Sequence, residues 1–172
     1  MRSLLARALA AAVVVSAVVT GTAHAEPRWS EPATIVVSDR TGDPRWQAAT
    51  QYAVAAWNSS GAGVALVWSE GGIGCQPEGN VVPVCRHRLA TPAVGLAYTW
   101  SSLGRLSGAY VLVTDRHLTQ LQANAIATHE VGHALGLAHS SVPGSLMGPG
   151  GNGTDHLALA DHEALWRLYG RP

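Results

Sequence analysis

Hydrophobic and polar positions along the first half of the chain follow two periods. Residues 33–38 (ATIVVS) and 63–70 (GVALVWSE) are short runs rich in β-branched and apolar residues, which is typical of strands. Between them, apolar residues at spacings of three and four predict a helix that begins near Pro44 and buries Trp46, Ala49, Ala53, Ala56 and Trp57. This order of strand, helix and strand predicts a parallel crossover within one sheet.

The second half predicts two more strands and two more helices. Residues 95–100 and 108–115 are β-rich and separated by a Gly/Ser turn, so we expect neighbouring strands of the same sheet. Residues 118–136 show helical periodicity that stops at Gly136. A glycine-rich segment follows to about residue 153, and residues 158–170 predict a last helix.

The first 25 residues have the pattern of a secretory signal peptide. Arg2 and Arg7 precede an apolar run over residues 8–19, and the small-residue site Ala23-His24-Ala25 follows. The alternative is a retained membrane anchor, but a spanning helix needs roughly 20 apolar residues and this run is shorter. We therefore expect residues 1–25 to be removed and residues 26–172 to form one secreted, extracellular domain.

Composition adds two restrictions. The 172 residues carry no net charge, 47% are hydrophobic and 13% are charged, which favours one globular domain over a disordered chain. All 11 basic residues are arginines scattered along the chain, so neither a nucleic acid nor, after removal of the signal peptide, a membrane is predicted as a partner.

The chain has two cysteines, Cys75 and Cys85, in the Gly/Pro-rich stretch GGIGCQPEGNVVPVC. In an exported protein this pair predicts a disulfide that closes a local loop. The alternative is that one thiolate binds a metal ion and keeps the protein latent.

Three histidines and a glutamate are concentrated in residues 129–139, HEVGHALGLAH. On a helix, His129 and His133 leave the same face one turn apart and can share one ion. His139 would lie roughly 9 Å further along an unbroken helix, out of reach of that ion. Gly136 accepts the left-handed conformation that ends helices, so the chain can turn there and bring His139 back.

This spacing predicts a catalytic zinc site. Three neutral imidazoles suit Zn²⁺ and leave its fourth position open for water. Glu130 lies about 100° from His129 around the helix, where its carboxylate can act as general base on a zinc-bound water. Surface histidines that bind no metal remain the alternative.

The motif His129-Glu130-x-x-His133-x-x-Gly136-x-x-His139 resembles the signature of the metzincin zinc proteases. Ser140 after the third histidine and the turn Met147-Gly148-Pro149 are similar to the matrixins, or matrix metalloproteinases. The resemblance implies that Met147 is the Met-turn residue, which lies beneath the metal without binding it.

The resemblance also implies a fold and a substrate site. We expect a zincin-like α+β fold with a twisted, mixed five-stranded sheet, an active-site helix and a small C-terminal subdomain after Gly136. We also expect the strand around Gly108, Ala109, Tyr110 and Val111 to be the edge strand at the cleft, where an extended peptide would pair with it.

Some features of matrixins are missing from the sequence. There is no Pro-Arg-Cys-Gly segment, and we expect no inhibitory prosegment before the first strand. The loop that binds structural zinc and calcium is also missing, which leaves a calcium requirement open.

We therefore predict a secreted zinc-dependent endopeptidase, acting as a monomer on extracellular proteins or peptides with one catalytic zinc ion. A secreted binding module that keeps zinc only to hold its fold is the alternative. A zinc hydrolase acting on other substrates would share the metal site but need no peptide-binding edge strand.

Overall fold

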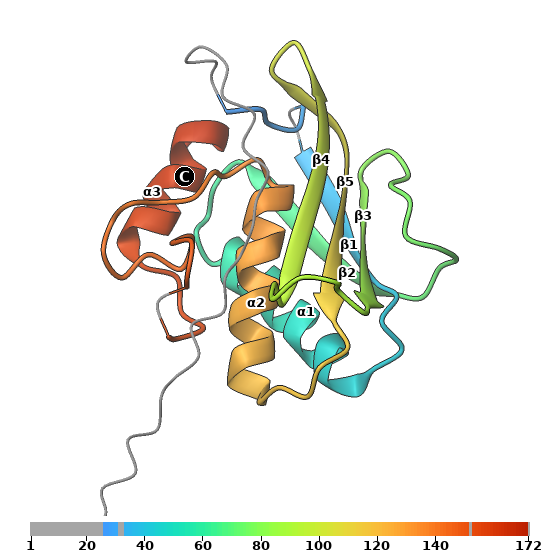
Figure 1. The fold of residues 1–172 in the computed structure, drawn as a ribbon. Helices are drawn as coiled ribbons and strands as arrows, with labels where there is room; N and C mark the ends of the chain where they lie inside the picture. Colours follow the sequence, from blue (N-terminus) through green and yellow to red (C-terminus); the bar gives the residue numbers. More distant parts are fainter. Residues whose placement is uncertain (1–25, 31–32, 152, 172) are drawn as a thin grey trace, which may run out of the picture.

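The computed structural model describes residues 26–30, 33–151 and 153–171, so the predicted signal peptide lies outside the described residues. Five strands form one mixed sheet in the order β2-β1-β3-β5-β4 (Figure 1). They are β1 (Ala33–Asp39), β2 (Val64–Glu70), β3 (Val81–His87), β4 (Gly95–Ser102) and β5 (Arg105–Thr114). β4 runs antiparallel to β5 and the other pairs are parallel, which confirms the predicted α+β fold with a mixed five-stranded sheet.

Within the described ranges, three helices accompany the sheet: α1 (Pro44–Asn58), α2 (Gln120–Ala134) and α3 (Leu159–Tyr169). α1 and α2 pack against each other and against the sheet, with α2 alongside β4 and β5. The indole N–H groups of Trp46 and Trp57 in α1 donate to the carbonyl oxygens of Thr114 and Thr128, at 3.2 and 2.8 Å. These two bonds fix α1 to the end of β5 and to the middle of α2, because both ring systems are fully buried in the core.

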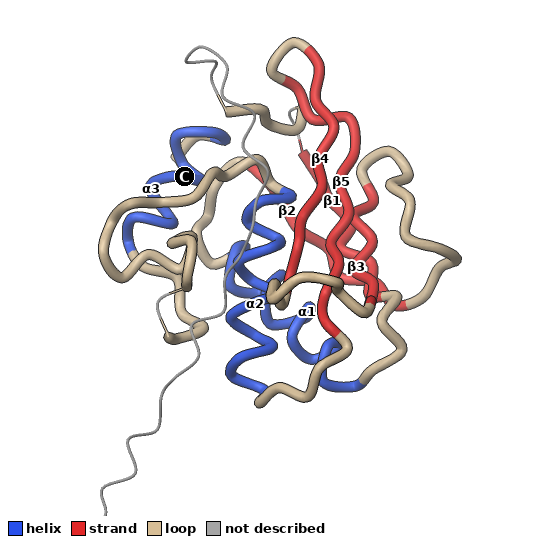
Figure 2. Tube along the Cα trace, viewed as in Figure 1, coloured by secondary structure: helices blue, strands red, loops and turns tan. Residues whose placement is uncertain are grey.

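The segment between α2 and α3 contains neither helix nor strand in its described residues and forms the small C-terminal region with α3 (Figure 2). Its position matches the subdomain expected after Gly136. No helix in the described ranges is long and apolar enough to cross a membrane.

The sequence did not predict β3. Its residues follow a Gly/Pro-rich stretch and include Pro83, which lacks the N–H that a central strand normally donates. Tertiary structure overrides this local signal, since β3 lies between β1 and β5 and buries Val82 and Val84 completely.

The prediction of the edge strand was wrong. Gly108, Ala109, Tyr110 and Val111 belong to β5, which lies between β3 and β4 in the sheet. The physical reason is that β3 occupies the side of β5 that would otherwise be free, with Val84 paired to Val111. The edge strand next to α2 is instead β4.

Candidate metal centre and active site

The helix α2 carries the first two histidines of the motif. It begins with a capping box, in which the Thr119 hydroxyl accepts from the backbone N–H of Gln122 and the Gln122 side chain accepts from the N–H of Thr119. Small buried side chains on one face let it approach α1 and the sheet closely: Ala123, Ala127, Val131 and Ala134. His129 and His133 therefore occupy a rigid element rather than a loop.

The helix stops where the sequence predicted. Gly136 has φ +100°. The N–H of Leu137 donates to the carbonyl of Gly132 at 3.1 Å, and the N–H of Gly136 donates to the carbonyl of His133 at 2.9 Å. These two bonds form a Schellman motif. A Cβ on Gly136 would lie 1.9 Å from the carbonyl oxygen of Pro27, so the packed N-terminal segment also requires glycine here.

The turn brings His139 back to the helix. One nitrogen from each of His129, His133 and His139 lies within 4.8 Å of the other two, in the one group of three or more potential metal ligands found among the described residues. The ring centroid of His139 is 5.3 Å from that of His129 and 4.7 Å from that of His133. The sequence prediction that these three imidazoles converge is confirmed.

Backbone carbonyls select the tautomers of the two helical histidines. Nδ1 of His129 lies 2.7 Å from the oxygen of Leu146, and Nδ1 of His133 lies 2.7 Å from that of Leu137. Since a carbonyl can only accept, each Nδ1 must donate its proton. The lone pair of each neutral ring is therefore on Nε2.

These lone pairs fit a divalent cation. The Nε2 atoms of His129 and His133 face each other at 3.0 Å, which is unfavourable for two acceptors. The buried Nε2 of His139 has no hydrogen-bond partner among the described residues. Three imidazole nitrogens that converge in this way, two of them held by carbonyls behind the rings, are a donor set that zinc prefers.

The electrostatics of the site keep the ligands neutral. Burial lowers the pKa of all three imidazoles, and lowers the pKa of His133 to about 3. At neutral pH the lone pairs are therefore available to a metal ion rather than occupied by protons.

Glu130 is the buried carboxylate beside this centre. Its side chain is 1% exposed, and neither oxygen makes a hydrogen bond of ordinary geometry within the described residues. Burial raises the pKa of its carboxyl to about 8, although a backbone hydrogen bond from Ala97 in β4 acts in the opposite direction. A buried carboxyl with so few polar contacts is costly for stability, which is typical of a group retained for function.

Gly95 makes room for this carboxylate. A Cβ on Gly95, the first residue of β4, would lie 2.6 Å from Oε1 and 2.7 Å from Cγ of Glu130. The edge strand and the carboxylate can therefore be neighbours only with glycine at this position.

Met147 is fully buried and packs against α2 at Gly132. A Cβ on Gly132 would lie 2.5 Å from Sδ of Met147 and 2.7 Å from the ring of Trp57. Gly132 directly precedes His133 in α2, so Met147 lies against the helix segment that carries the ligands. Its role beneath the metal remains a prediction.

The sequence analysis missed Asp161, a buried residue of α3. Its carboxylate accepts hydrogen bonds from the hydroxyl of Ser145 and from the N–H groups of Leu146, Met147 and Ala158. Leu146 in turn accepts the bond from Nδ1 of His129. A signal was present, because Asp161 shares its helix face with the buried Leu165 and Leu168 at spacings of four and seven.

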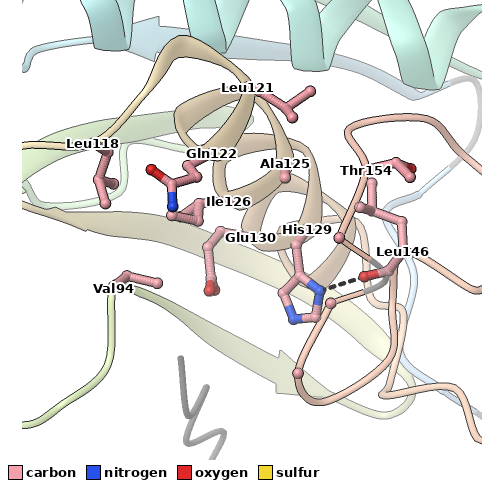
Figure 3. A pocket seen from close by; sticks show the side chains of 13 residues that line it. Val94, Leu118, Leu121, Gln122, Ala125, Ile126, His129, Glu130, Leu146 and Thr154 are labelled. Carbon is pink, nitrogen blue, oxygen red and sulfur yellow. Dashed lines mark hydrogen bonds between the residues drawn. The ribbon is translucent and has the colours of Figure 1, made fainter. Parts of the chain in front are cut away.

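An apolar pocket opens beside His129 and Glu130 (Figure 3). It has a volume of about 170 Å³. Its walls come from the residue before β4, from α2 and the loop that leads into it, and from the segment around and after Met147. The lining residues besides His129 and Glu130 are Val94, Leu118, Leu121, Gln122, Ala125, Ile126, Leu146, Gly150, Gly151, Gly153 and Thr154. A pocket of this kind next to a buried carboxylate can hold an apolar side chain while its backbone lies at the metal centre.

Comparison with known proteins agrees with this geometry. The sequence model of the matrixin family matches residues 7–170. Mouse matrix metalloproteinase-25 is 49% identical over 53 residues, which cover 27% of this chain and 9% of that protein. Metalloendoproteinase 5-MMP of Arabidopsis thaliana is 40% identical over 72 residues, which cover 40% of this chain and 19% of that protein.

The chain thus spans less than a fifth of the length of these relatives. Among solved structures, myroilysin superimposes with a TM-score of 0.58 at 16% identity, over 89% of this chain and 94% of the other. At this identity the likeness concerns the fold alone.

Proposed function

Because the chain belongs to the matrixin family, we propose that it is a secreted zinc-dependent endopeptidase that hydrolyses peptide bonds in extracellular proteins as a monomer. The observation that carries the proposal is the convergence of His129, His133 and His139 beside the buried carboxylate of Glu130. A centre that only stabilised the fold would gain nothing from that carboxylate, because four-coordinate structural sites need no buried acid beside the metal.

His129, His133 and His139 would hold the zinc ion. When bound, zinc would polarise the substrate carbonyl and lower the pKa of a water molecule. The carbonyls of Leu146 and Leu137 would keep the first two imidazoles oriented, because each receives the Nδ1 proton of one ring.

Glu130 would act as general base and then as general acid. Its burial favours the protonated carboxyl, whereas a cation at the three imidazoles would favour the carboxylate. These opposing effects would leave the pKa of Glu130 close to the working pH, where one group can both accept and return a proton. Its carboxylate would take the proton of the attacking water and pass it to the leaving amine.

The edge strand β4 would bind the substrate backbone. β5 satisfies one side of β4, and α2 with Glu130 lies next to its first residue, Gly95. An extended peptide could add to the other side of β4 by main-chain hydrogen bonds. The apolar pocket beside Glu130 would then select one of the two side chains that flank the scissile bond.

Two substitutions test the roles of ligand and base. We expect Glu130→Ala to keep about one zinc per chain and to lose about 10²–10⁴-fold in kcat, because only proton transfer is removed. His133→Ala should lose both zinc and activity, since two imidazoles bind zinc much more weakly than three. Metal analysis and hydrolysis of a quenched fluorescent peptide measure both effects.

The wild-type protein treated with a chelator and then resupplied with zinc is the control, and its activity should return. A Glu130→Ala protein with nearly wild-type kcat would refute the mechanism. A wild-type protein that binds zinc but cleaves no peptide would support a binding module instead.

Secretion has its own test. If residues 1–25 are a signal peptide, the protein recovered from the medium of a secreting host should begin at Glu26 and be active without further cleavage. N-terminal sequencing and the peptide assay check this. An active form that begins inside β1, or a Glu26 form that is inactive until it is cut, would contradict the proposal.

A further inference from the structure

Three glycines contribute backbone to the wall of the apolar pocket that lies opposite α2. They are Gly150, Gly151 and Gly153, which we call the glycine wall, followed by Thr154. Gly151 and Gly153 have φ values of +66° and +77°. Because these glycines have many accessible backbone conformations and no side chain to pack, the contacts at the two ends of the wall contribute to its position.

The first end is fixed by the turn that contains Met147. The N–H of Ser140 donates to the carbonyl of Met147 at 2.9 Å, and the N–H of Gly151 donates to that of Gly148 at 2.9 Å. These bonds lie on the side of the wall that is close to the metal centre.

The second end is fixed by Asp155, which directly follows Thr154 and is 6% exposed. One of its carboxylate oxygens, Oδ2, accepts from the side-chain amide of Asn124 in α2 at 3.0 Å. The Asn124 amide oxygen accepts from Gln120 at 2.8 Å, which orients its N–H₂ group toward Asp155. Asp155 therefore ties the wall to the helix that carries the histidines.

A second contact joins the same point to α1. The hydroxyl of Tyr52 lies 3.1 Å from Nδ1 of His156, the residue after Asp155. Burial and, after it, the Asp155 carboxylate raise the pKa of Tyr52, which agrees with a position close to that carboxylate. α1 and α2 thus both hold the end of the glycine wall.

We propose that the hydrogen bond between Asn124 and Asp155 sets the width of the apolar pocket, and so determines which side chain next to the scissile bond is accepted. The proposal rests on the proposed function. Asn124 and Asp155 are positioning residues, because neither lines the pocket. They act by fixing the glycine wall at its distance from Ile126 and Leu118 on the opposite side.

The test uses an exchange of the two side chains. Asn124→Asp places two carboxylates against each other and should release the wall. The double variant Asn124→Asp/Asp155→Asn restores one donor and one acceptor with the direction of the bond reversed. Gln51→Glu, on the exposed surface of α1, adds the same charge away from the pocket and is the matched control.

The first readout is selectivity. Fluorogenic peptides differ only in the residues flanking the scissile bond, which are varied one at a time among Ala, Leu and Trp. One methylene in a well-fitted apolar pocket changes kcat/KM by about tenfold or more. For Asn124→Asp we therefore expect the differences in kcat/KM between peptides to become about three- to tenfold smaller, mainly through changes in KM. The double variant should return these ratios to within about twofold of wild type.

The second readout does not depend on catalysis. Amide hydrogen exchange in peptides covering residues 148–157 should be faster in Asn124→Asp than in wild type, and slow again in the double variant. If wild type cleaves no peptide, the proposed function and the selectivity part of this proposal both fail, and the exchange measurement then decides only whether the Asn124–Asp155 bond fixes the glycine wall. The proposal is overturned if Asn124→Asp has the selectivity of wild type or the hydrogen exchange of wild type. It is also overturned if the double variant folds but recovers neither the wild-type selectivity nor the slow exchange.

Discussion

At the scale of single residues, the metal centre depends on carbonyl and carboxylate groups behind the ligands. His129 is oriented by the carbonyl of Leu146, and Leu146 is held by the carboxylate of Asp161 in α3. The ligand on α2 is therefore positioned by a residue 32 positions later in the sequence. Such outer partners commonly change metal affinity when they are altered.

Asp161→Asn tests this chain of contacts. An amide keeps the shape of the carboxylate but offers one acceptor oxygen in place of two. Each oxygen of Asp161 accepts two hydrogen bonds, so two of the four donors, which belong to Ser145, Leu146, Met147 and Ala158, would lose their acceptor. We expect the free energy of unfolding to fall by about 2–4 kcal/mol and zinc affinity to fall about 10–100-fold. Urea denaturation and zinc competition with a chelating dye measure the two effects.

The matched control is Glu163→Gln, which makes the same chemical change at an exposed position of the same helix. It should alter neither quantity measurably. Wild-type zinc affinity in Asp161→Asn would show that the Met147 turn holds His129 in place without the carboxylate.

At the scale of elements, the end of α2 determines whether a third ligand reaches the metal. The Schellman motif at Gly136 reverses the chain within a few residues and returns His139 to the helix. The N-terminal segment packs over this turn, where Pro27 contacts Gly136 and the Glu26 carboxylate accepts from the N–H of Ala138 at 3.3 Å.

Gly136→Ala should disrupt this turn. The added Cβ meets the Pro27 carbonyl and is also strained by a φ of +100°. We expect a loss of about 2–4 kcal/mol in the free energy of unfolding, together with weaker zinc binding because His139 is displaced. Thermal unfolding with and without zinc separates the two losses.

Gly144→Ala is the control for backbone strain alone. Gly144 has φ +82°, but a Cβ there would meet no heavy atom within 4 Å. We expect about 1–2 kcal/mol of destabilisation and normal zinc binding. Equal effects of the two variants on zinc binding would mean that the contact with Pro27 is unimportant.

At the scale of the whole molecule, the disulfide fastens the loop between β2 and β3 to the sheet. Cys75 and Cys85 are bonded, as the sequence predicted, and Cys85 pairs with Leu112 of the neighbouring strand β5. Arg40 holds the same loop, since its guanidinium donates to the carbonyls of Ile73 and Gly74 at 3.0 and 3.1 Å. The disulfide and the two hydrogen bonds of Arg40 thus both attach the loop to the sheet.

Removing the disulfide should lower stability and leave the metal centre intact. For Cys75→Ser/Cys85→Ser we expect the free energy of unfolding to fall by about 2–3 kcal/mol, because the unfolded chain gains freedom over a separation of 10 residues. Zinc content at 25 °C should stay near wild type. Urea denaturation with and without reductant measures the loss, and the double variant should not respond to reductant.

The sequence by itself determined the features that depend on neighbouring residues. The spacing of His129, His133 and His139, the helix that carries two of them and the glycine that ends it were predicted because helical periodicity and a left-handed stop are local properties. The pairing of Cys75 with Cys85 was predicted for the same reason, since only a short loop separates them.

Tertiary structure alone decided the features that depend on distant parts of the chain. β3 became a central strand although Pro83 argues against it, and it thereby moved Gly108–Val111 into the interior of the sheet and left β4 at the edge. The bonds of Asp161 to the Met147 turn and of Asp155 to Asn124 likewise join separate elements. Strand order and such contacts follow from which surfaces bury one another, and local periodicity carries no information about that choice.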